Sequence, residues 1–227
     1  MSKPRVRSRA QARARSSGKI LNVAEKYFAT LGYSGTSLRR IATEAEVQLA
    51  LIYYYFGSKA QLYEEVLRRH TALLNTRRIA ELDRLRAQQA PLEPVLQDLV
   101  TPLIDYAMKG GASGRRFVLL LARLFFSSDK ESAELVRKHF DPVASRFIEE
   151  MERVLPELDR RTVAWIYAFT VGTSLGSLAS EERVSRLADG KAALSPEELE
   201  RTVVTFVLGG AQAVAQAAAR AAEPHSP

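Results

Sequence analysis

The 227-residue chain contains no cysteine, which excludes disulfide bonds, thiolate nucleophiles and cysteine-ligated zinc. Its three histidines, His70, His139 and His225, are far apart in sequence and form no metal-spaced pair. The sequence also lacks a nucleophile elbow, a glycine-rich phosphate loop and any alternating strand pattern. We therefore predict no catalytic site, no metal and no other cofactor, and these absences favour a binding protein over an enzyme.

Long hydrophobic runs are missing as well. The most apolar stretch, between Val203 and Ala219, is interrupted by Thr205, Gln212 and Gln216, and it predicts a packing helix rather than a membrane span. A secretory signal would require an apolar segment after the basic N-terminal residues, and none follows them here. With 46% apolar and 26% charged residues, the composition is that of a globular protein. We expect a cytoplasmic protein with no membrane partner.

Acidic residues are absent from the first 19 positions, which carry seven basic ones. The other 208 residues balance 26 basic against 26 acidic side chains, so the net charge of +7 belongs to this segment. Because Val6 is its only large apolar residue, residues 1–16 are predicted to form a disordered basic arm. Such an arm beside DNA-binding helices follows the phosphate backbone or enters the minor groove. The alternative is a solubilising tail.

Helical periodicity runs along nearly the whole chain and predicts an all-α protein of about nine helices. The first should run from Ser17 to Leu31 and end at Gly32, and residues 223–227 should be a loose tail. Residues 117–126 are apolar on all sides apart from an arginine, so that helix should lie at the centre of the core. The remaining long helices are expected at residues 60–89, 92–108, 115–127, 129–155 with a bend near Pro142, 160–182, and 195–220, the last opening on a Ser-Pro-Glu-Glu capping box.

Two short helices between residues 37 and 56 have the form of a helix-turn-helix. Apolar residues recur at i, i+3, i+4 and i+7 from Leu38, which gives the first helix one buried face. After a turn at Glu46, the second helix buries Ile52, Tyr55 and Phe56. In a helix-turn-helix the second helix lies in the major groove of DNA. Its outward face would consist of Gln48, Leu49, Ala50, Tyr53 and Tyr54.

Positive charge stands at two helix starts, where helices normally favour acidic residues. Thr36 or Ser37 can cap the first short helix, yet its first turn carries Arg39 and Arg40. The next helix, at residues 58–61, combines capping-box spacing with a lysine at the first helical position. An external anion would relieve both conflicts, so we interpret the two starts as phosphate contacts. The alternative is that these cations are ordinary solvated charges.

The sequences GTSLRRIA at residues 35–42 and IYYYFGSK at residues 52–59, with Leu62, resemble the TetR family of bacterial one-component repressors. The resemblance covers roughly residues 17–65. It implies a three-helix DNA-binding domain at 17–63 and a helical ligand-binding and dimerisation domain at 64–222. By position it implies phosphate contacts from Thr36, Ser37, Arg39, Tyr54, Tyr55 and Lys59, to which the helix-start argument adds Arg40, and base contacts from Gln48, Leu49, Ala50 and Tyr53.

The chain departs from the family pattern at two points. The family usually has glycine in the turn where this chain has Glu46, so that residue either adopts a positive φ or belongs to another type of turn. The recognition helix carries Leu49 and Leu51 instead of lysine or threonine, which favours apolar contact with thymine methyl groups.

Small residues interrupt two helices near the C-terminus. Gly172 and Gly176 lie in one helix and Gly209 and Gly210 in the other, and each glycine costs about 1 kcal/mol relative to alanine. Close approach of another helix would offset that cost, either inside the chain or at a symmetric interface between two chains. We predict the interface, formed by Gly172, Gly176, Phe206, Gly210 and Val214.

A surplus of large apolar residues in the C-terminal half predicts a ligand site, the alternative being a filled core. Residues 117–156 and the spacing from Trp165 to Gly172 are similar to PsrA-type regulators, which implies a long-chain acyl ligand. Arg115, Arg116 or Arg123 is available for an acidic head group. The predicted lining is Phe117, Leu120, Leu121, Leu124, Phe147, Met151, Trp165 and Phe169.

The sequence thus predicts a dimeric, ligand-responsive transcriptional regulator, a repressor that binds double-stranded DNA at a palindromic operator. A small hydrophobic ligand, such as a fatty acid or acyl-CoA, would release it. The alternative function is that of an architectural protein binding DNA without sequence preference.

Overall fold

The computed structural model describes residues 4–190 and 194–222, and in these residues it contains eleven α-helices and no strand. The predicted all-α class is therefore confirmed, whereas the predicted loose tail at 223–227 lies outside the described residues. The chain divides into two compact units. The first contains residues 1–72 and 119–136, and the second contains residues 73–118 and 137–227.

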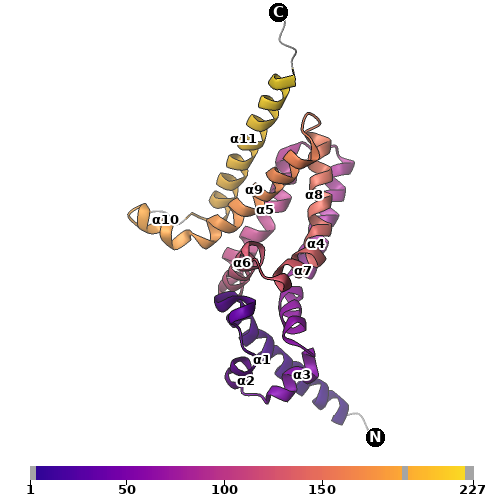
Figure 1. Cartoon of the computed structure of the whole chain (residues 1–227), viewed down its shortest axis with the longest axis vertical. Helices are drawn as coiled ribbons and strands as arrows, with labels where there is room; N and C mark the ends of the chain where they lie inside the picture. The colour runs from indigo at the N-terminus through magenta and orange to yellow at the C-terminus, as the bar shows by residue number, and fades with distance from the viewer. Residues whose placement is uncertain (1–3, 191–193, 223–227) are drawn as a thin grey trace, which may run out of the picture. The chain divides into compact units, whose positions relative to one another are not determined.

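The first unit is built on the helix-turn-helix. Helix α1 (Pro4–Gly35) packs against α2 (Leu38–Glu44) and α3 (Leu49–Phe56), as Figure 1 shows. The unit also contains the start of α4 (Lys59–Ala87), the second half of α6 (Gly111–Phe126) and most of α7 (Lys130–His139). Its fully buried side chains include Ile20, Phe28, Ile41, Ile52, Leu62 and Val66.

Helix α1 is longer than predicted at its N-terminal end. It begins at Pro4, where we had expected a disordered arm over residues 1–16. Alanine and arginine dominate residues 9–15 and are among the strongest helix formers, so local propensity favours continuation of the helix into the basic segment. The predicted break at Gly32 is confirmed, because its φ of 69° and ψ of −178° are not helical.

The second unit is a bundle around α5 (Leu92–Lys109). It also contains α8 (Asp141–Val154), α9 (Arg160–Ala179), α10 (Glu181–Leu187) and α11 (Pro196–Ala222). Helix α5 packs most extensively against α11 and also contacts α8 and α9, and Figure 1 shows these helices side by side. Their shared core includes Val95, Leu96, Val100, Phe147, Met151, Val163, Val203 and Val207.

Two predicted helices are divided in the structure. The predicted helix at 129–155 is broken at Phe140, because Pro142 lacks an N–H and its ring clashes with the carbonyl four residues earlier. The predicted helix at 160–182 ends at Ala179, and α10 starts after Ser180. The capping box of α11 is confirmed: Glu198 N donates to Ser195 Oγ at 3.1 Å, and Ser195 N donates to the Glu198 carboxylate at 2.8 Å.

The prediction that α6 lies at the centre of the core is wrong, because the helix is exposed on one side. Phe117, Leu120 and Leu124 are buried, but Leu119 is 43% exposed and Phe126 is 70% exposed. One face of the helix is therefore buried and the other faces solvent, although the solvent-facing side also carries apolar residues.

Candidate functional site

The turn of the helix-turn-helix is strained at Glu46, where the sequence departs from the TetR pattern that it resembles. Glu46 has a φ of 56°, in the left-handed region that glycine adopts more readily. Of the two alternatives that the sequence left open for this turn, the structure has the positive φ. The Glu46 N–H donates to the Thr43 carbonyl at 3.2 Å, and its carboxylate lies 3.3 Å from Lys19 Nζ. These contacts help to hold the turn.

Helix α3 turns its aromatic residues outward. Tyr53 is 51% exposed and Tyr54 is 73% exposed. Gln48, the N-cap residue of α3, and Ala50 are also exposed, whereas Leu49 is half-buried. Large exposed side chains gathered on one short helix form a surface that can contact base edges and sugars in a groove.

The start of α2 is cationic, as predicted. Arg39 and Arg40 are exposed in its first turn, which contains no acidic residue, and the Arg40 guanidinium lies 5.0 Å from the centre of the Tyr27 ring. Ser37 is the N-cap residue, but its side chain makes no capping hydrogen bond. The free N–H groups and the two cations together form a place where a phosphate would be stabilised.

Thr36 differs from the other predicted phosphate contacts because its side chain faces inward. The residue is only 4% exposed, and its hydroxyl donates to the Gly32 carbonyl at 2.7 Å. We correct its predicted role accordingly: Thr36 holds the segment between α1 and α2, since its hydroxyl already has a partner.

The start of α4 is capped as expected, but its lysine has internal partners. Gln61 N donates to Ser58 Oγ at 3.1 Å, which is half of the predicted capping box. Lys59 Nζ lies 4.4 Å from the centre of the Tyr33 ring. Burial lowers the pKa of Lys59, although nearby Glu131 and Asp129 act in the opposite direction. Lys59 is therefore only partly available to a phosphate.

The basic segment of α1 lies beside the recognition helix. The Arg13 guanidinium is 5.7 Å from the centre of the Tyr55 ring, and Tyr55 itself is half-buried. Arg15 is exposed. Helix α1 therefore brings its N-terminal positive charge to the same side of the unit as α3.

A buried hydrogen-bonded contact that sequence periodicity did not reveal joins α1 to α4. His70 Nε2 and Glu25 Oε2 are 2.9 Å apart, and their side chains are 3% and 1% exposed. The two residues are 45 positions apart, so no local pattern links them. The pair connects the helix that carries the basic segment with the helix that follows the helix-turn-helix.

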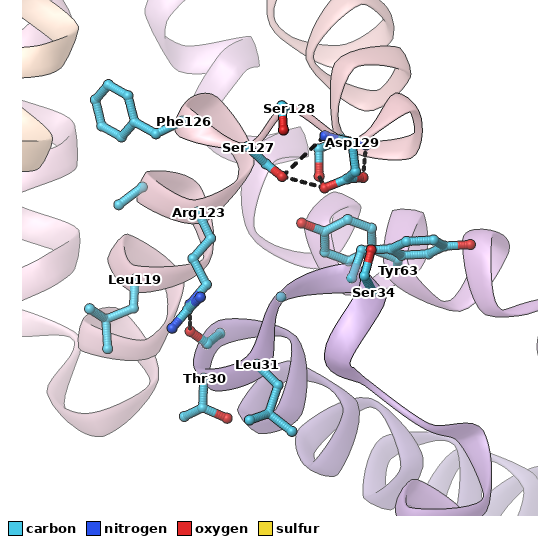
Figure 2. A pocket seen from close by; sticks show the side chains of 15 residues that line it. Thr30, Leu31, Ser34, Tyr63, Leu119, Arg123, Phe126, Ser127, Ser128 and Asp129 are labelled. Atoms are coloured by element: carbon cyan, nitrogen blue, oxygen red, sulfur yellow. Dashed lines mark hydrogen bonds between the residues drawn. The ribbon is translucent and has the colours of Figure 1, made fainter.

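A groove of about 890 Å³ also lies within the first unit, between the end of α1 and the α6–α7 turn. Figure 2 shows Arg123 reaching from α6 toward α1, where its Nε donates to the Ala29 carbonyl at 2.7 Å. The rim includes the exposed Leu119 and Phe126 together with Ser34. The groove is open to solvent. The hydrogen bond of Arg123 at its side attaches α6 to the end of α1, just before the helix-turn-helix.

Helices α9 and α11 each present an apolar face that the chain does not cover. By length and composition both could cross a membrane, and only 28% of the most apolar 18-residue stretch of each helix is buried. On α9, Trp165 and Phe169 stack with ring centres 5.6 Å apart and are 59% and 60% exposed. On α11, Phe206 is 71% exposed and Val214 is 39% exposed.

The glycines of these two helices have no packing role inside the chain. A Cβ atom built on Gly172, Gly176, Gly209 or Gly210 would meet nothing within 4 Å. Gly172 and Gly176 continue the face of Trp165, and Gly210 lies between Phe206 and Val214 on α11. Tight packing within the chain therefore does not explain these residues.

The eight residues predicted to line a ligand site are divided between the two units. Phe117, Phe147 and Met151 are buried in the second unit, and Leu120, Leu121 and Leu124 are buried in the first. The exposed Trp165 and Phe169 belong instead to the open face of α9. Of the arginines suggested for an acidic head group, Arg115 is exposed and Arg123 is bonded to α1.

Comparison with protein families matches both parts of the chain. Residues 20–66 match the family described as bacterial regulatory proteins, tetR family, and residues 97–210 match the tetracyclin repressor-like C-terminal domain. Over 101 residues the chain is 38% identical to the HTH-type transcriptional repressor NicS of Pseudomonas putida. That alignment spans 44% of this chain and 46% of the repressor, so the chain aligns with less than half of that protein.

Solved structures share the fold at low sequence identity. A Clostridium perfringens protein provisionally named a fatty acid metabolism regulator has a TM-score of 0.62 at 17% identity, covering 85% of this chain and 97% of its own. A TetR-family transcriptional regulator from Bordetella parapertussis has a TM-score of 0.62 at 22% identity, covering 85% and 93%. With both family models matched in their proper order along the sequence, the chain belongs to the TetR family of bacterial transcriptional regulators.

Proposed function

We propose that this regulator is a dimeric repressor that binds a palindromic operator and leaves it when a small hydrophobic ligand binds. The observation that carries the proposal is the outward face of α3, with Tyr53 and Tyr54 exposed beside the cationic start of α2. In a TetR-type helix-turn-helix this face meets DNA. The 38% identity with a transcriptional repressor supports repression as the direction of control.

DNA contacts divide by chemistry into two groups. Arg39, Arg40 and Ser37 surround the start of α2 and would hold a phosphate, with Tyr54, Tyr55 and Lys59 as further backbone contacts. Phosphate contacts fix the register of the protein on DNA and give most of the salt dependence. The bases would be read by Gln48, Leu49, Ala50 and Tyr53, whose mixture of amide, methyl and phenol groups suits thymine methyl groups and adenine edges.

Dimerisation would bury the open faces of α9 and α11. Large apolar patches on a monomer mark an interaction surface, and glycines with open space above them allow two helices to approach closely. A two-fold arrangement of these helices would place two recognition helices on one palindrome. The alternative is that these faces are buried in a membrane, which would not suit a protein that binds DNA in the cytoplasm.

The ligand would act through the second unit. A hydrophobic compound would bind among the buried apolar residues of this unit, which include Phe117, Phe147 and Met151. The fold is shared with a protein named for fatty acid metabolism, which supports an acyl compound as the first class to test. Release requires that the ligand bind the DNA-incompatible state more tightly than the DNA-bound state.

Selection of bound duplexes from a random pool, followed by affinity measurements over a salt series, tests the DNA-binding part of this proposal. We expect one enriched palindrome whose half-site centres lie about one helical turn, 10–10.5 bp, or a multiple of it apart. Its advantage over random DNA should persist as salt weakens both complexes. Equal binding to all duplexes would instead assign an architectural role.

A further inference from the structure

Four side chains described in the second unit leave a buried polar atom without a hydrogen-bond partner: the half-buried Asn75 and the buried Arg78, Asp98 and Glu150. The first three concern us here. Asn75 and Arg78 lie one turn apart on α4, and Asp98 lies on α5. Arg78 Nη2 donates to the Leu99 carbonyl at 2.6 Å, and Asn75 Nδ2 donates to the His139 carbonyl at 3.0 Å. Three buried atoms of these side chains have no partner: Arg78 Nε, Asp98 Oδ2 and Asn75 Oδ1.

This arrangement is costly, and one other buried side chain shares it: Glu150 Oε2 also has no hydrogen-bond partner, although Glu150 Oε1 accepts from Arg153 Nε at 2.7 Å. Arg78 is 8% exposed and Asp98 is 9% exposed, and a buried polar atom without a partner costs on the order of 1–3 kcal/mol, more when it is charged. Elsewhere, Thr170 and Ser174 donate to carbonyls of their own helix at 2.8 Å. A ligand group that supplies the missing hydrogen-bond partners would therefore gain more binding free energy than a group that binds a solvated surface.

The protonation state of Asp98 determines which hydrogen-bonding groups this cluster can bind. Burial raises the pKa of Asp98 to about 7, even though the charge of Arg78 acts to lower it. Burial likewise lowers the pKa of Arg78, against the pull of Tyr167 and Asp98. Near neutral pH the Asp98 carboxyl can thus donate or accept a hydrogen bond, Arg78 donates, and the amide oxygen of Asn75 accepts.

The missing partners define the complementary group. It needs an acceptor for Arg78 Nε and a donor for Asn75 Oδ1. A simple carboxylate or ester supplies acceptors alone and leaves Asn75 unmet. A carboxamide, whether open-chain or within a ring, supplies both. The surrounding core is apolar, with Leu96, Leu99 and the partly buried Tyr167 among its members.

We propose that Asn75, Arg78 and Asp98 form the recognition site for the polar end of the effector, and that the effector is a small apolar compound carrying a carboxamide-type group. The inference rests on the proposed function, because it takes the second unit as the place where the effector acts. It replaces Arg115, Arg116 and Arg123 as the residues that select the head group.

Two probe series on the full chain test this assignment. Decanamide, decanoate and methyl decanoate share an acyl body, and benzamide and methyl benzoate share an aromatic one. We expect the amide of a series to bind the wild type at least about tenfold more tightly than its ester by calorimetry. Arg78→Met should remove that preference, while Arg77→Met, at an exposed position on the same helix, should retain it.

Asn75→Leu serves as a second variant, because it removes the amide acceptor without leaving a buried charge unpaired. It should lower affinity for amides and leave affinity for esters within about twofold of the wild type. Circular dichroism and DNA binding show whether each variant is folded.

The two series separate the outcomes. Binding of benzamide alone, dependent on Arg78, would reject the acyl assignment of the proposed function and support the polar site. Equal affinity for amide and ester, an unchanged preference in Arg78→Met, or no binding in either series would overturn the polar site while leaving the DNA-binding function untouched.

Discussion

The two units of the molecule differ in how completely the polar groups of their side chains find hydrogen-bond or ion-pair partners. In the first unit a buried histidine and glutamate meet at 2.9 Å, and the strained turn at Glu46 has a hydrogen bond and an ion pair to hold it. In the second unit, Asn75, Arg78 and Asp98 keep unpaired buried atoms.

The same contrast holds on the surface. The first unit exposes aromatic residues on one short helix, where a DNA groove would cover them. The second exposes apolar faces along two long helices, with glycines that no intrachain neighbour explains. A ligand-responsive unit is regulated by partners that it lacks when it is alone.

The largest effect is expected at the uncovered faces of the second unit. Gly172→Leu or Gly210→Leu should raise the dimer dissociation constant about 100-fold or more, because a leucine side chain would separate two helices that need close contact. Folding should survive, since a Cβ meets nothing within 4 Å in the chain. Sedimentation velocity measures the change. Gly18→Leu, at another open helical glycine, is the control, and unchanged dimers in both variants would move the interface elsewhere.

Substitutions in the first unit should separate the two kinds of DNA contact. Tyr53→Ala should cost about 1–3 kcal/mol on the selected operator and little on random DNA, because Tyr53 is assigned to the bases. Arg39→Ala should weaken both complexes and lower the slope of log affinity against log salt by about one unit. Fluorescence anisotropy over a salt series measures both. If the two variants behaved alike on both duplexes, the division of roles would be wrong.

The buried carboxyl of Asp98 makes the second unit sensitive to pH. Its folded-state pKa is raised to about 7 by burial, against about 3.9 in an unfolded chain. Its protonated form therefore stabilises the fold fully below pH 4, and this stabilisation is lost as the pH rises through about 7. Asp98→Asn should be more stable than the wild type at pH 8 by about 2 kcal/mol, with the difference shrinking toward pH 4.

Urea unfolding at several pH values checks this prediction. Asp105→Asn provides the control, because Asp105 is a surface residue of the same helix, 2.7 Å from Lys109 Nζ. If Asp98→Asn were less stable than the wild type at pH 8, the prediction would be wrong, and Arg78 would need the carboxylate as its counter-ion.

The smallest effect is expected at the turn. Glu46→Gly should stabilise the protein by about 0.5 kcal/mol, since relief of the left-handed strain outweighs the added freedom of the unfolded chain. Glu46→Ala keeps the strain and removes the carboxylate, so it should bring no gain. Thermal unfolding compares the two. Equal stability of the glycine and alanine variants would show that the φ of 56° stores little energy.

Local features were predictable from the sequence. The helix-turn-helix, the break at Gly32, the positive φ of Glu46 and the capping box at Ser195 each depend on residues within one or two turns of one another. Periodicity and capping rules act over that distance. The basic segment was less predictable, because its charge suggested disorder while its alanine and arginine content favours helix.

Long-range pairs could not be predicted in this way. Glu25 and His70 are 45 residues apart, and Arg78 bonds a carbonyl 21 residues away, so no spacing rule connects them. Composition also suggested that α6 was buried throughout, but only packing decides which of its apolar residues face solvent. The polar residues that now define the candidate effector site were missed for the same reason.

The most direct test of the account is the mass of the complex on the selected duplex, measured by native mass spectrometry. The open faces of α9 and α11 and the two-fold reading of a palindrome together predict two chains on each duplex, with no stable complex of one chain. A single chain bound to each duplex, together with a monomer in free solution, would contradict the claim that the second unit is completed by a second copy.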